Sequence, residues 1–257
     1  MYAKELEIAK EACREAGVIL RSRMGKVHEI SKKGEIDLVT EADLAAEKTI
    51  LKIIGRHFPD DAILAEETGK QGPAGARTWI IDPLDGTTNY AHGFPFFAVS
   101  IALETGSQGV VGLVYNPGMD ELFEAVKGKG AFLNGAPLQT SRTKSIKESL
   151  LATGFPYDVH QRSEEVVSLL HKMLTRAQGI RRLGSAALDL CYVAAGRLDG
   201  FWEEDLKPWD TAAGNIIVGE AGGRLTTYDG RPYTPYQKTV VASNGWIHEE
   251  MTAVTRP

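Results

Sequence analysis

Three short runs of strand-forming residues follow one another closely in the first half of the chain. They cover residues 97–103, 109–115 and 121–126, and glycines or the turn sequence Asn116-Pro117-Gly118 stand between them. Connections of so few residues join antiparallel neighbours, because a parallel pair of strands needs a crossover of about a dozen residues or more. The sequence therefore predicts an antiparallel sheet in this part of the chain.

Helices are expected before this sheet, and helices alternating with strands after it. Apolar residues recur every three or four positions over residues 4–24 and 41–57, the spacing of one helix face. Residues 78–81 form a β-rich run that ends at Asp82-Pro83, which predicts a strand and then an abrupt turn. Further elements are predicted at residues 150–153, 163–177, 184–195, 198–203, 210–221 and 239–243.

Helices and antiparallel strands in both halves predict an α+β protein built of layers. We place a boundary near residue 145, which gives an N-terminal half at residues 1–145 and a C-terminal half at residues 146–257. The sequence has no internal repeat and no long polar linker. The two halves are therefore expected to form one integrated unit.

Length, composition and charge exclude several classes of protein. Of the 257 residues, 43% are hydrophobic and 25% charged, which is typical of a globular protein with a sizeable core. No apolar stretch approaches the roughly 18–20 residues that cross a bilayer, so no membrane span is expected. A net charge of −5 without a basic stripe disfavours a nucleic-acid partner. The charged amino terminus and the presence of only two cysteines predict a reduced, cytoplasmic protein.

Four acidic stretches stand out, and each taken singly has an ordinary structural explanation. Asp43 lies three residues after Thr40 and can complete a helix capping box. Glu66-Glu67 can be solvated loop charge, and Asp82-Pro83 and Asp85-Gly86 are common turn dipeptides. Asp210 precedes an apolar helical run and can be its N-cap.

Taken together, these stretches indicate a metal and phosphate site. Asp82 and Asp85 flank a tight turn at a strand end. Both carboxylates and the intervening carbonyl oxygen of Leu84 can therefore face the same metal site. Gly86 and the residues after it can open a short helix whose free N–H groups attract phosphate. Oxygen ligands beside such a turn suit Mg²⁺. Zinc is disfavoured, because the six histidines show no paired ligand spacing.

Two long segments carry a resemblance to a known family. The sequence WIIDPLDGTTNYAHGFP, from Trp79 to Pro95, resembles the first signature of the inositol monophosphatase family. The sequence WDTAAGNIIVGEAGG, from Trp209 to Gly223, resembles the second. Residues 37–43 and 66–67 match further family segments in the same order, so the resemblance covers essentially the whole chain. It implies a layered α/β/α/β/α sandwich that hydrolyses phosphate monoesters with two or three Mg²⁺ ions.

The resemblance also implies roles for individual residues. Glu66, Thr87 and Asp43 correspond to the catalytic residues. Asp43 orients Thr87, and this pair, together with Glu66, positions and deprotonates the attacking water. The implied metal ligands are Glu66, Asp82, Leu84 through its carbonyl oxygen, Asp85 and Asp210. The implied substrate-binding residues are Gly86, Thr87, Ala186, Glu203 and Asp210. The first half thus carries most of the metal ligands, and the second half carries Asp210 and substrate contacts. Glu67 is a neighbouring acid without an assigned role.

The activity we expect is Mg²⁺-dependent hydrolysis of myo-inositol 1-phosphate to inositol and phosphate. Metal-activated water needs no Ser, Cys or His nucleophile, because phosphoryl transfer depends on positioning and charge neutralisation. The alternatives are a fructose-1,6-bisphosphatase, an enzyme with both activities, or a non-catalytic binding protein on the same fold. A 3′-phosphonucleotide phosphatase is disfavoured, because Thr88 stands where such relatives tend to have Lys.

Two further features leave alternatives open. The glycine-rich residues 68–78 form a short segment that follows the acidic residues Glu66 and Glu67. A short segment at the edge of the active site would exclude fewer substrates, so the site could accept several phosphorylated polyols or sugars. A homodimer is expected from the resemblance, and the apolar residues 96–123 could supply its interface. A buried sheet layer explains those apolar residues equally well.

Overall fold

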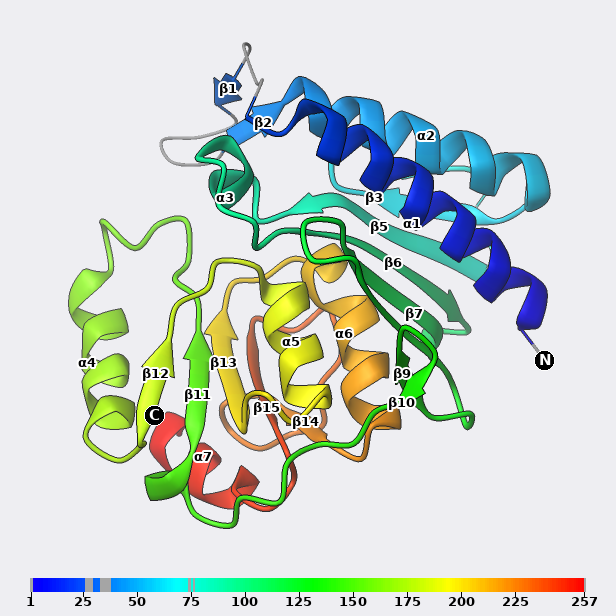
Figure 1. Cartoon of the computed structure of the whole chain (residues 1–257). Helices are drawn as coiled ribbons and strands as arrows, with labels where there is room; N and C mark the ends of the chain where they lie inside the picture. Colours follow the sequence, from blue (N-terminus) through cyan, green and yellow to red (C-terminus); the bar gives the residue numbers. More distant parts are fainter. Residues whose placement is uncertain (1, 26–29, 33–37, 74, 76, 257) are drawn as a thin grey trace.

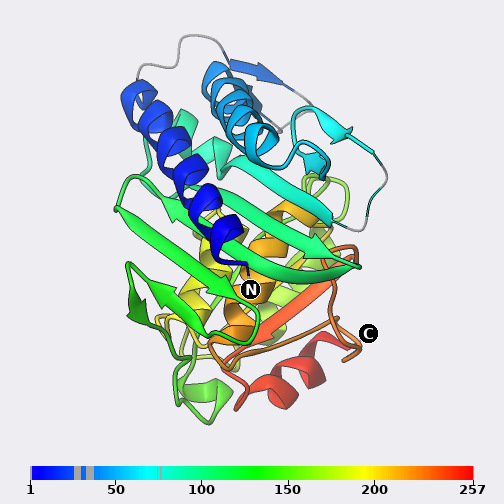
Figure 2. The ribbon, with the colours of Figure 1, turned by 90° about the vertical axis from the view of Figure 1, so that its right-hand side faces the viewer.

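The computed structural model describes residues 2–25, 30–32, 38–73, 75 and 77–256, and its elements form five layers. Helices α1 (Ala3–Arg23) and α2 (Glu41–His57) cover one face of an eight-stranded sheet (Figures 1 and 2). Helices α5 (Ala186–Ala194) and α6 (Pro208–Glu220) lie between that sheet and a five-stranded one. Helices α4 (Ser163–Leu174) and α7 (His248–Thr255) cover the outer face of the second sheet. The predicted layered α/β/α/β/α sandwich is confirmed.

The eight-stranded sheet contains the predicted antiparallel run. Its strand order is β10-β9-β8-β7-β6-β5-β3-β4, and β6, β7 and β8 pair antiparallel with their neighbours as the short connections require. Strand β3 runs parallel to β5. The strands are β3 (Ala62–Ala65), β4 (Gly69–Gln71), β5 (Arg77–Asp85), β6 (Ala98–Thr105), β7 (Gln108–Asn116), β8 (Glu121–Val126), β9 (Ala131–Leu133) and β10 (Ala136–Pro137).

The five-stranded sheet differs from the prediction in strand direction. Its order is β12-β11-β13-β15-β14, and β11 runs parallel to both β12 and β13. The expectation of antiparallel strands was therefore wrong for β11, because α4 and α5 supply the long crossovers that parallel pairs need, whereas β13 and β14 both pair antiparallel with β15. The strands are β11 (Leu150–Thr153), β12 (Gly179–Arg181), β13 (Gly200–Glu204), β14 (Arg224–Thr226) and β15 (Thr239–Ser243).

Alternation along the central strands distributes their side chains between separate cores. On β5, Trp79 and Ile81 pack with α1 and α2, whereas Ile80 packs into the core between the two sheets. On β13, Phe201 faces that inner core and Trp202 faces the core beneath α4 and α7. Successive strand side chains point to opposite faces, so a sheet covered on both sides needs apolar residues at every position.

The short remaining elements complete the chain. They are the strand pair β1 (Ile30–Lys32) and β2 (Leu38–Thr40), the one-turn helix α3 (Thr87–Ala91), and a 3₁₀ turn, Ile146–Glu148. Cys13 and Cys191 are both buried and free. In the part of the chain that the structure describes, no helix combines the length and apolar character needed to cross a membrane.

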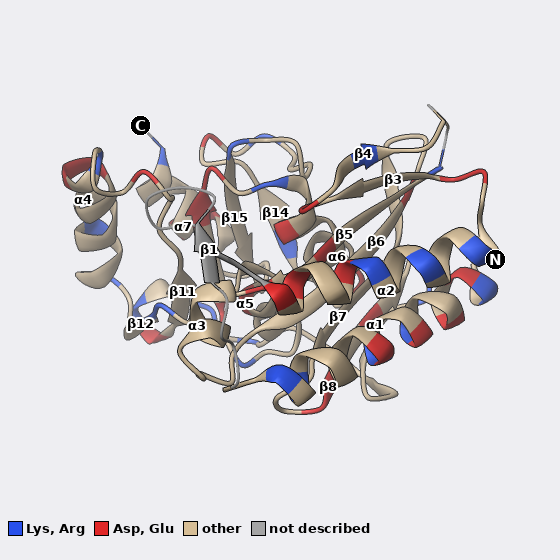
Figure 3. Ribbon diagram, turned by 90° about the horizontal axis from the view of Figure 1, so that it is seen from above, with Lys and Arg blue, Asp and Glu red and all other residues tan. Residues whose placement is uncertain are grey.

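The apolar residues from 96 to 123 are largely buried within the chain itself. Phe97, Val99 and Phe123 have no exposed surface, and the sheet is covered by helices on both faces. These residues therefore form a buried sheet layer, the second of the two explanations considered for them. On α1, Lys and Arg are interspersed with Glu, whereas on α2 the acidic residues lie toward the start of the helix and the basic residues toward its end (Figure 3).

Candidate active site

The end of β5 holds two of the expected ligands on an irregular stretch of strand. The sequence predicted that the strand stops at Asp82, but β5 continues to Asp85 and its pairing with β6 shifts between these two residues. Pro83 has no N–H to offer the ladder, which is a reason for an irregularity at this place. Oδ1 of Asp82 accepts a 2.9 Å hydrogen bond from the N–H of Leu84, which fixes the intervening turn.

The expected metal ligands line one cavity of about 150 Å³. Glu66 follows β3, Asp82 and Asp85 lie on β5, and Asp210 lies in the first turn of α6. Four carboxylates from three separate segments thus surround one space, together with Leu84. Asp210 is not the N-cap of α6 but lies within its first turn, where Oδ2 accepts the N–H of Lys207 at 2.7 Å.

These carboxylates disfavour one another's charge. Burial raises the pKa of Asp82 well above its ordinary value, and the charges of Glu66, Asp85 and Asp210 raise it further. Burial also raises the pKa of Asp85 to about 6, although hydrogen bonds from Ser185 and Ala187 oppose the shift. The pKa of Asp210 is raised by burial and then by Asp85. A cation in the cavity would relieve this repulsion.

The donor set suits a hard divalent cation. Among the described residues, no three Asp, Glu, His or Cys side chains are drawn together closely enough to enclose a metal as they stand. The side chains around the cavity nevertheless present carboxylate oxygens and no sulfur or imidazole ligand. Such a set of carboxylate ligands fits Mg²⁺, which uses a few carboxylates, keeps water and is completed by substrate phosphate.

Thr87 connects Asp43 to this cavity. Its Oγ1 lies 3.3 Å from Oδ1 of Asp43 and 3.0 Å from the carbonyl oxygen of Leu84. Asp43 is fully buried on α2, whereas Thr87 lies in the cavity wall at the start of α3. The structure therefore brings together the Thr–Asp pair that the family resemblance implied.

Gly86 allows two chain segments to approach each other beside the carboxylates. Its φ is +92°, and a Cβ atom here would lie 3.1 Å from the carbonyl oxygens of both Gly184 and Phe96. Nearby, the Asn89 side-chain amide donates to the carbonyl oxygens of Phe96 and Leu183 at 2.7 and 2.8 Å. These contacts hold the turn after β5 against the segment that leads into α5.

A second cavity of about 110 Å³ adjoins the first, and Asp85, Gly86, Thr87 and Asp210 line both. Ala186 and Glu203 line this second cavity, as expected for substrate contacts. Glu203 lies on β13, and burial raises the pKa of its carboxyl to about 8, although the charge of Arg182 opposes the shift. A Cβ atom on Gly154 would lie 2.1 Å from the Glu203 carboxylate oxygens, so a side chain at this position would displace that carboxylate.

Three residues around the site were missed by the sequence analysis. Ser185 donates to Asp85, and Arg182 lines the second cavity. Glu47 is 1% exposed, and its carboxylate accepts the N–H groups of Glu67 and Thr68 at 2.9 and 3.0 Å, which holds the turn after Glu66. The available signal was spacing, because Glu47 follows Asp43 by one helical turn and so shares its face of α2.

Two of the sequence predictions fall partly outside the described residues. Asp37, at the start of one matched segment, is not described, and residues 74 and 76 of the glycine-rich segment are not described either. Within that segment, Gly69–Gln71 forms β4 and pairs with β3.

Comparison with known proteins identifies the family. The family model described as "Inositol monophosphatase family" matches residues 1–257. The chain belongs to the inositol monophosphatase family. It is therefore a phosphoric monoester hydrolase of a metal-dependent family.

Individual members of the inositol monophosphatase family are similar to this chain in sequence and in structure. The chain is 49% identical to a protein named "Inositol-1-monophosphatase" from Synechocystis sp., over 96% of this chain and 87% of the relative. It is 42% identical to "Nus factor SuhB" from Salmonella typhimurium, over 98% and 95% of the two chains. A crystal structure of the "extragenic suppressor protein suhB" from Bartonella henselae superposes with a TM-score of 0.95, at 40% identity and 99% coverage of both chains.

Proposed function

We propose that this protein hydrolyses myo-inositol 1-phosphate to inositol and phosphate with Mg²⁺ as its cofactor. The observation that carries the proposal is the pair of adjoining cavities, one lined by four carboxylates and the other by Glu203 and Ala186. The first suits cations and the phosphate that they neutralise, and the second suits the hydroxyl groups of a polyol. The Synechocystis relative, named inositol-1-monophosphatase, supports this choice of substrate.

Glu66, Asp82, Asp85, Asp210 and the carbonyl oxygen of Leu84 would hold two or three Mg²⁺ ions. When bound there, Mg²⁺ supplies positive charge against the phosphate and lowers the pKa of water. The Thr87 hydroxyl donates a hydrogen bond to the Asp43 carboxylate, which would orient Thr87 Oγ1 toward a water molecule beside Glu66. The N–H groups of Gly86 and Thr87 bind the phosphate oxygens. Glu203 accepts hydrogen bonds from the polyol, which Ala186 and Asp210 also contact.

A sugar bisphosphate is the second candidate substrate, because one observation favours it. Arg182 lines the second cavity, and its guanidinium carbon lies 5.6 Å from the centre of the Phe155 ring. A positive charge in this wall can pair with a second phosphate at the far end of fructose 1,6-bisphosphate. The same observation does not require a bisphosphate, since Arg182 also balances the nearby carboxylates.

A panel of phosphate esters tests both candidates. Phosphate release is measured with myo-inositol 1-phosphate, fructose 1,6-bisphosphate, a 3′-phosphonucleotide and phenyl phosphate, each in millimolar Mg²⁺ and in excess chelator. We expect the highest kcat/KM with myo-inositol 1-phosphate and no turnover in chelator. A preference for fructose 1,6-bisphosphate that disappears in Arg182→Gln would establish the second candidate instead.

Paired variants separate an enzyme from a binding protein that has only retained the fold. Asp85→Asn preserves the shape of a proposed ligand and removes its charge, so the rate should fall by about 100-fold or more. The exposed Asp60→Asn, remote from both cavities, serves as the control and should be fully active. Equal activity of the two variants would contradict the proposed function.

The prediction of no nucleic-acid partner stays a prediction, since several relatives bear the name Nus factor.

A further inference from the structure

Asp189 is a buried carboxylate to which the proposed function gives no role. It lies on α5, is 1% exposed, and its Oδ1 has no hydrogen-bond partner among the residues that the structure describes. An unpaired buried carboxylate oxygen is unfavourable for folding, because it has lost its water without gaining another donor. A residue that serves packing alone would be more stable as an apolar side chain at this position.

Asp189 is one of the residues that line the second cavity. Glu203 and Gly154 line the same space, and Arg182 is the cation in its wall. Burial raises the pKa of Asp189 well above its ordinary value, and the charges of Glu203 and Asp85 raise it further, while Arg182 lowers it. An unsatisfied acceptor in a cavity wall is the arrangement expected where a ligand supplies the missing donor.

Helix α5 fixes where Asp189 stands relative to the carboxylates of the first cavity. Ser185 and Ala187, at the start of this helix, both donate to Oδ2 of Asp85. Asp189 follows Ser185 by four residues, and its N–H bonds the Ser185 carbonyl oxygen at 2.9 Å, so the two side chains share one helix face a turn apart. Asp189 therefore stands one turn along α5 from the contacts that orient Asp85.

The chemistry of this position selects the kind of group it can bind. A carboxylate beside Glu203 repels phosphate and accepts hydrogen bonds, so it suits a hydroxyl group rather than the phosphate end of a substrate. We propose that Asp189 binds a hydroxyl group of the polyol or sugar part of the substrate, and that together with Glu203 it determines substrate specificity. This inference rests on the proposed function and assigns a second hydroxyl-binding carboxylate to the same site.

The test compares Asp189→Ala and Asp189→Asn with the wild-type protein on three kinds of substrate. These are myo-inositol 1-phosphate, its monodeoxy analogues, and phenyl phosphate, which has no hydroxyl group on its ring. In the wild-type protein, one deoxy analogue should lose about 10- to 100-fold in kcat/KM, because it leaves Asp189 without a donor. Asp189→Ala should lose a similar factor with myo-inositol 1-phosphate and should no longer distinguish it from that analogue.

Two further measurements distinguish this role from a structural one. Hydrolysis of phenyl phosphate by Asp189→Ala should stay within about twofold of the wild-type rate, and its melting temperature should be equal or higher, since a buried carboxyl oxygen without a hydrogen-bond partner is removed. Asp189→Asn, which keeps an acceptor oxygen, should recover part of the loss on myo-inositol 1-phosphate.

Several outcomes would overturn the inference. They are equal losses on phenyl phosphate and on myo-inositol 1-phosphate, an unchanged dependence on the substrate hydroxyls, or no loss at all. A wild-type protein that hydrolyses phenyl phosphate but no polyol or sugar phosphate would overturn the proposed substrate class, and this inference with it, before any variant is compared.

Discussion

The hydroxyl of Ser185 donates a 2.6 Å hydrogen bond to Oδ2 of Asp85 and joins the start of α5 to the end of β5, 100 residues earlier in the chain. The N–H of Ala187 donates to the same oxygen at 2.8 Å. One carboxylate oxygen is therefore held by the protein, and this leaves the other for the cavity. Groups that orient a metal ligand in this way contribute about 10- to 100-fold to metal affinity.

Ser185→Ala should raise the Mg²⁺ concentration that gives half-maximal activity by about tenfold, because Asp85 loses its hydroxyl donor. Stability should fall by about 1 kcal/mol, since the same hydroxyl also accepts the N–H of Leu188 and caps α5. Phosphate release titrated with Mg²⁺ measures the first effect, and urea unfolding measures the second. The exposed helical Ser168→Ala is the control. If stability falls while the Mg²⁺ requirement stays the same, Ser185 serves the helix cap alone.

Gly154→Ala should weaken substrate binding by about tenfold in KM, because the added Cβ would stand 2.1 Å from the Glu203 carboxylate and displace it. The loss should be larger for myo-inositol 1-phosphate than for phenyl phosphate, which offers Glu203 no hydroxyl group. Gly219→Ala on α6 is the matched control, since a Cβ there meets no atom within 4 Å. Equal kinetics for the two variants would show that Glu203 can move without consequence.

Glu47→Gln should reduce the stability of the protein by about 2 kcal/mol, because one of the two N–H groups that now bond to a charged carboxylate would face an amide N–H instead. The turn that carries Glu66 should shift, so Mg²⁺ should bind more weakly. Denaturant unfolding and Mg²⁺ titration measure the two effects, with the exposed Glu164→Gln as control. A variant with lower stability but unchanged Mg²⁺ binding would show that Glu47 stabilises the fold without affecting the metal site.

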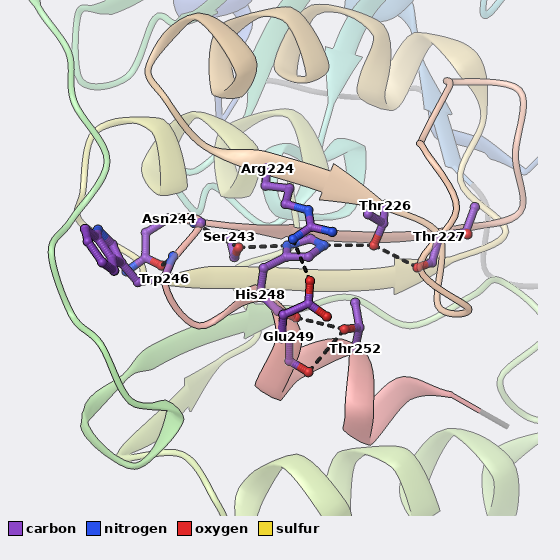
Figure 4. A network of polar contacts seen from close by, with 10 residues as sticks. Arg224, Thr226, Thr227, Ser243, Asn244, Trp246, His248, Glu249 and Thr252 are labelled. Carbon is purple, nitrogen blue, oxygen red and sulfur yellow. Dashed lines mark hydrogen bonds and ion pairs between the residues drawn. The ribbon is translucent and has the colours of Figure 1, made fainter.

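The protein should lose stability as pH falls from about 7 to about 4 because of His248. Figure 4 shows this fully buried ring between two hydroxyls, with Ser243 Oγ 2.8 Å from Nδ1 and Thr226 Oγ1 2.9 Å from Nε2. Thr226 already donates to the carbonyl oxygen of Thr227, so Nε2 carries the proton of a neutral ring. Burial and, less strongly, the charge of Arg224 lower the pKa of His248 to about 4, although Glu249 opposes the shift.

Between these pH values the unfolded chain, with an ordinary histidine pKa of about 6.5, binds more protons than the folded protein. The resulting loss of unfolding free energy is on the order of 2 kcal/mol after solvent screening, and it is absent above about pH 7. Urea unfolding at several pH values checks this. His248→Gln should be less stable at pH 7, and its free energy of unfolding should change less as the pH falls below 7. The exposed His160→Gln should show the same pH dependence as the wild-type protein.

The sequence was sufficient for features that depend on short spacing. The tight connections between β6, β7 and β8 required antiparallel pairing, and the helical periods of α1 and α2 marked those helices within a residue or two. The resemblance then supplied the site residues, and the structure places them around two adjoining cavities, except for Asp43, which contacts the cavity wall through Thr87. Periodicity alone could not have joined Glu66, Asp82 and Asp210, which come from separate segments.

Features that depend on long-range packing could not be predicted. The parallel pairing of β11 with β12 and β13 follows from crossovers through α4 and α5, and a short apolar strand carries no signal of its direction. Glu47 resembles any helical glutamate until the turn after Glu66 comes to lie against it. Ser185 and Asp189 are likewise ordinary helix residues in the sequence, and their contacts arise only when α5 packs beside β5 and β13.

The central claim is that four carboxylates from three segments tolerate one another because Mg²⁺ binds between them. Close pairs of such charges repel by about 4 kcal/mol at an effective dielectric constant of 20. Asp82→Asn removes one of these charges from a buried position, and its side-chain oxygen can still accept the N–H of Leu84.

Melting temperatures of the wild-type protein and Asp82→Asn, each in excess chelator and across a Mg²⁺ titration, test this claim most directly. In chelator the variant should be at least as stable as the wild-type protein, because it carries less repulsion. With increasing Mg²⁺ the wild-type melting temperature should rise with the logarithm of the concentration and overtake that of the variant. A wild-type melting temperature that Mg²⁺ leaves unchanged, or an equal rise in both proteins, would contradict the account.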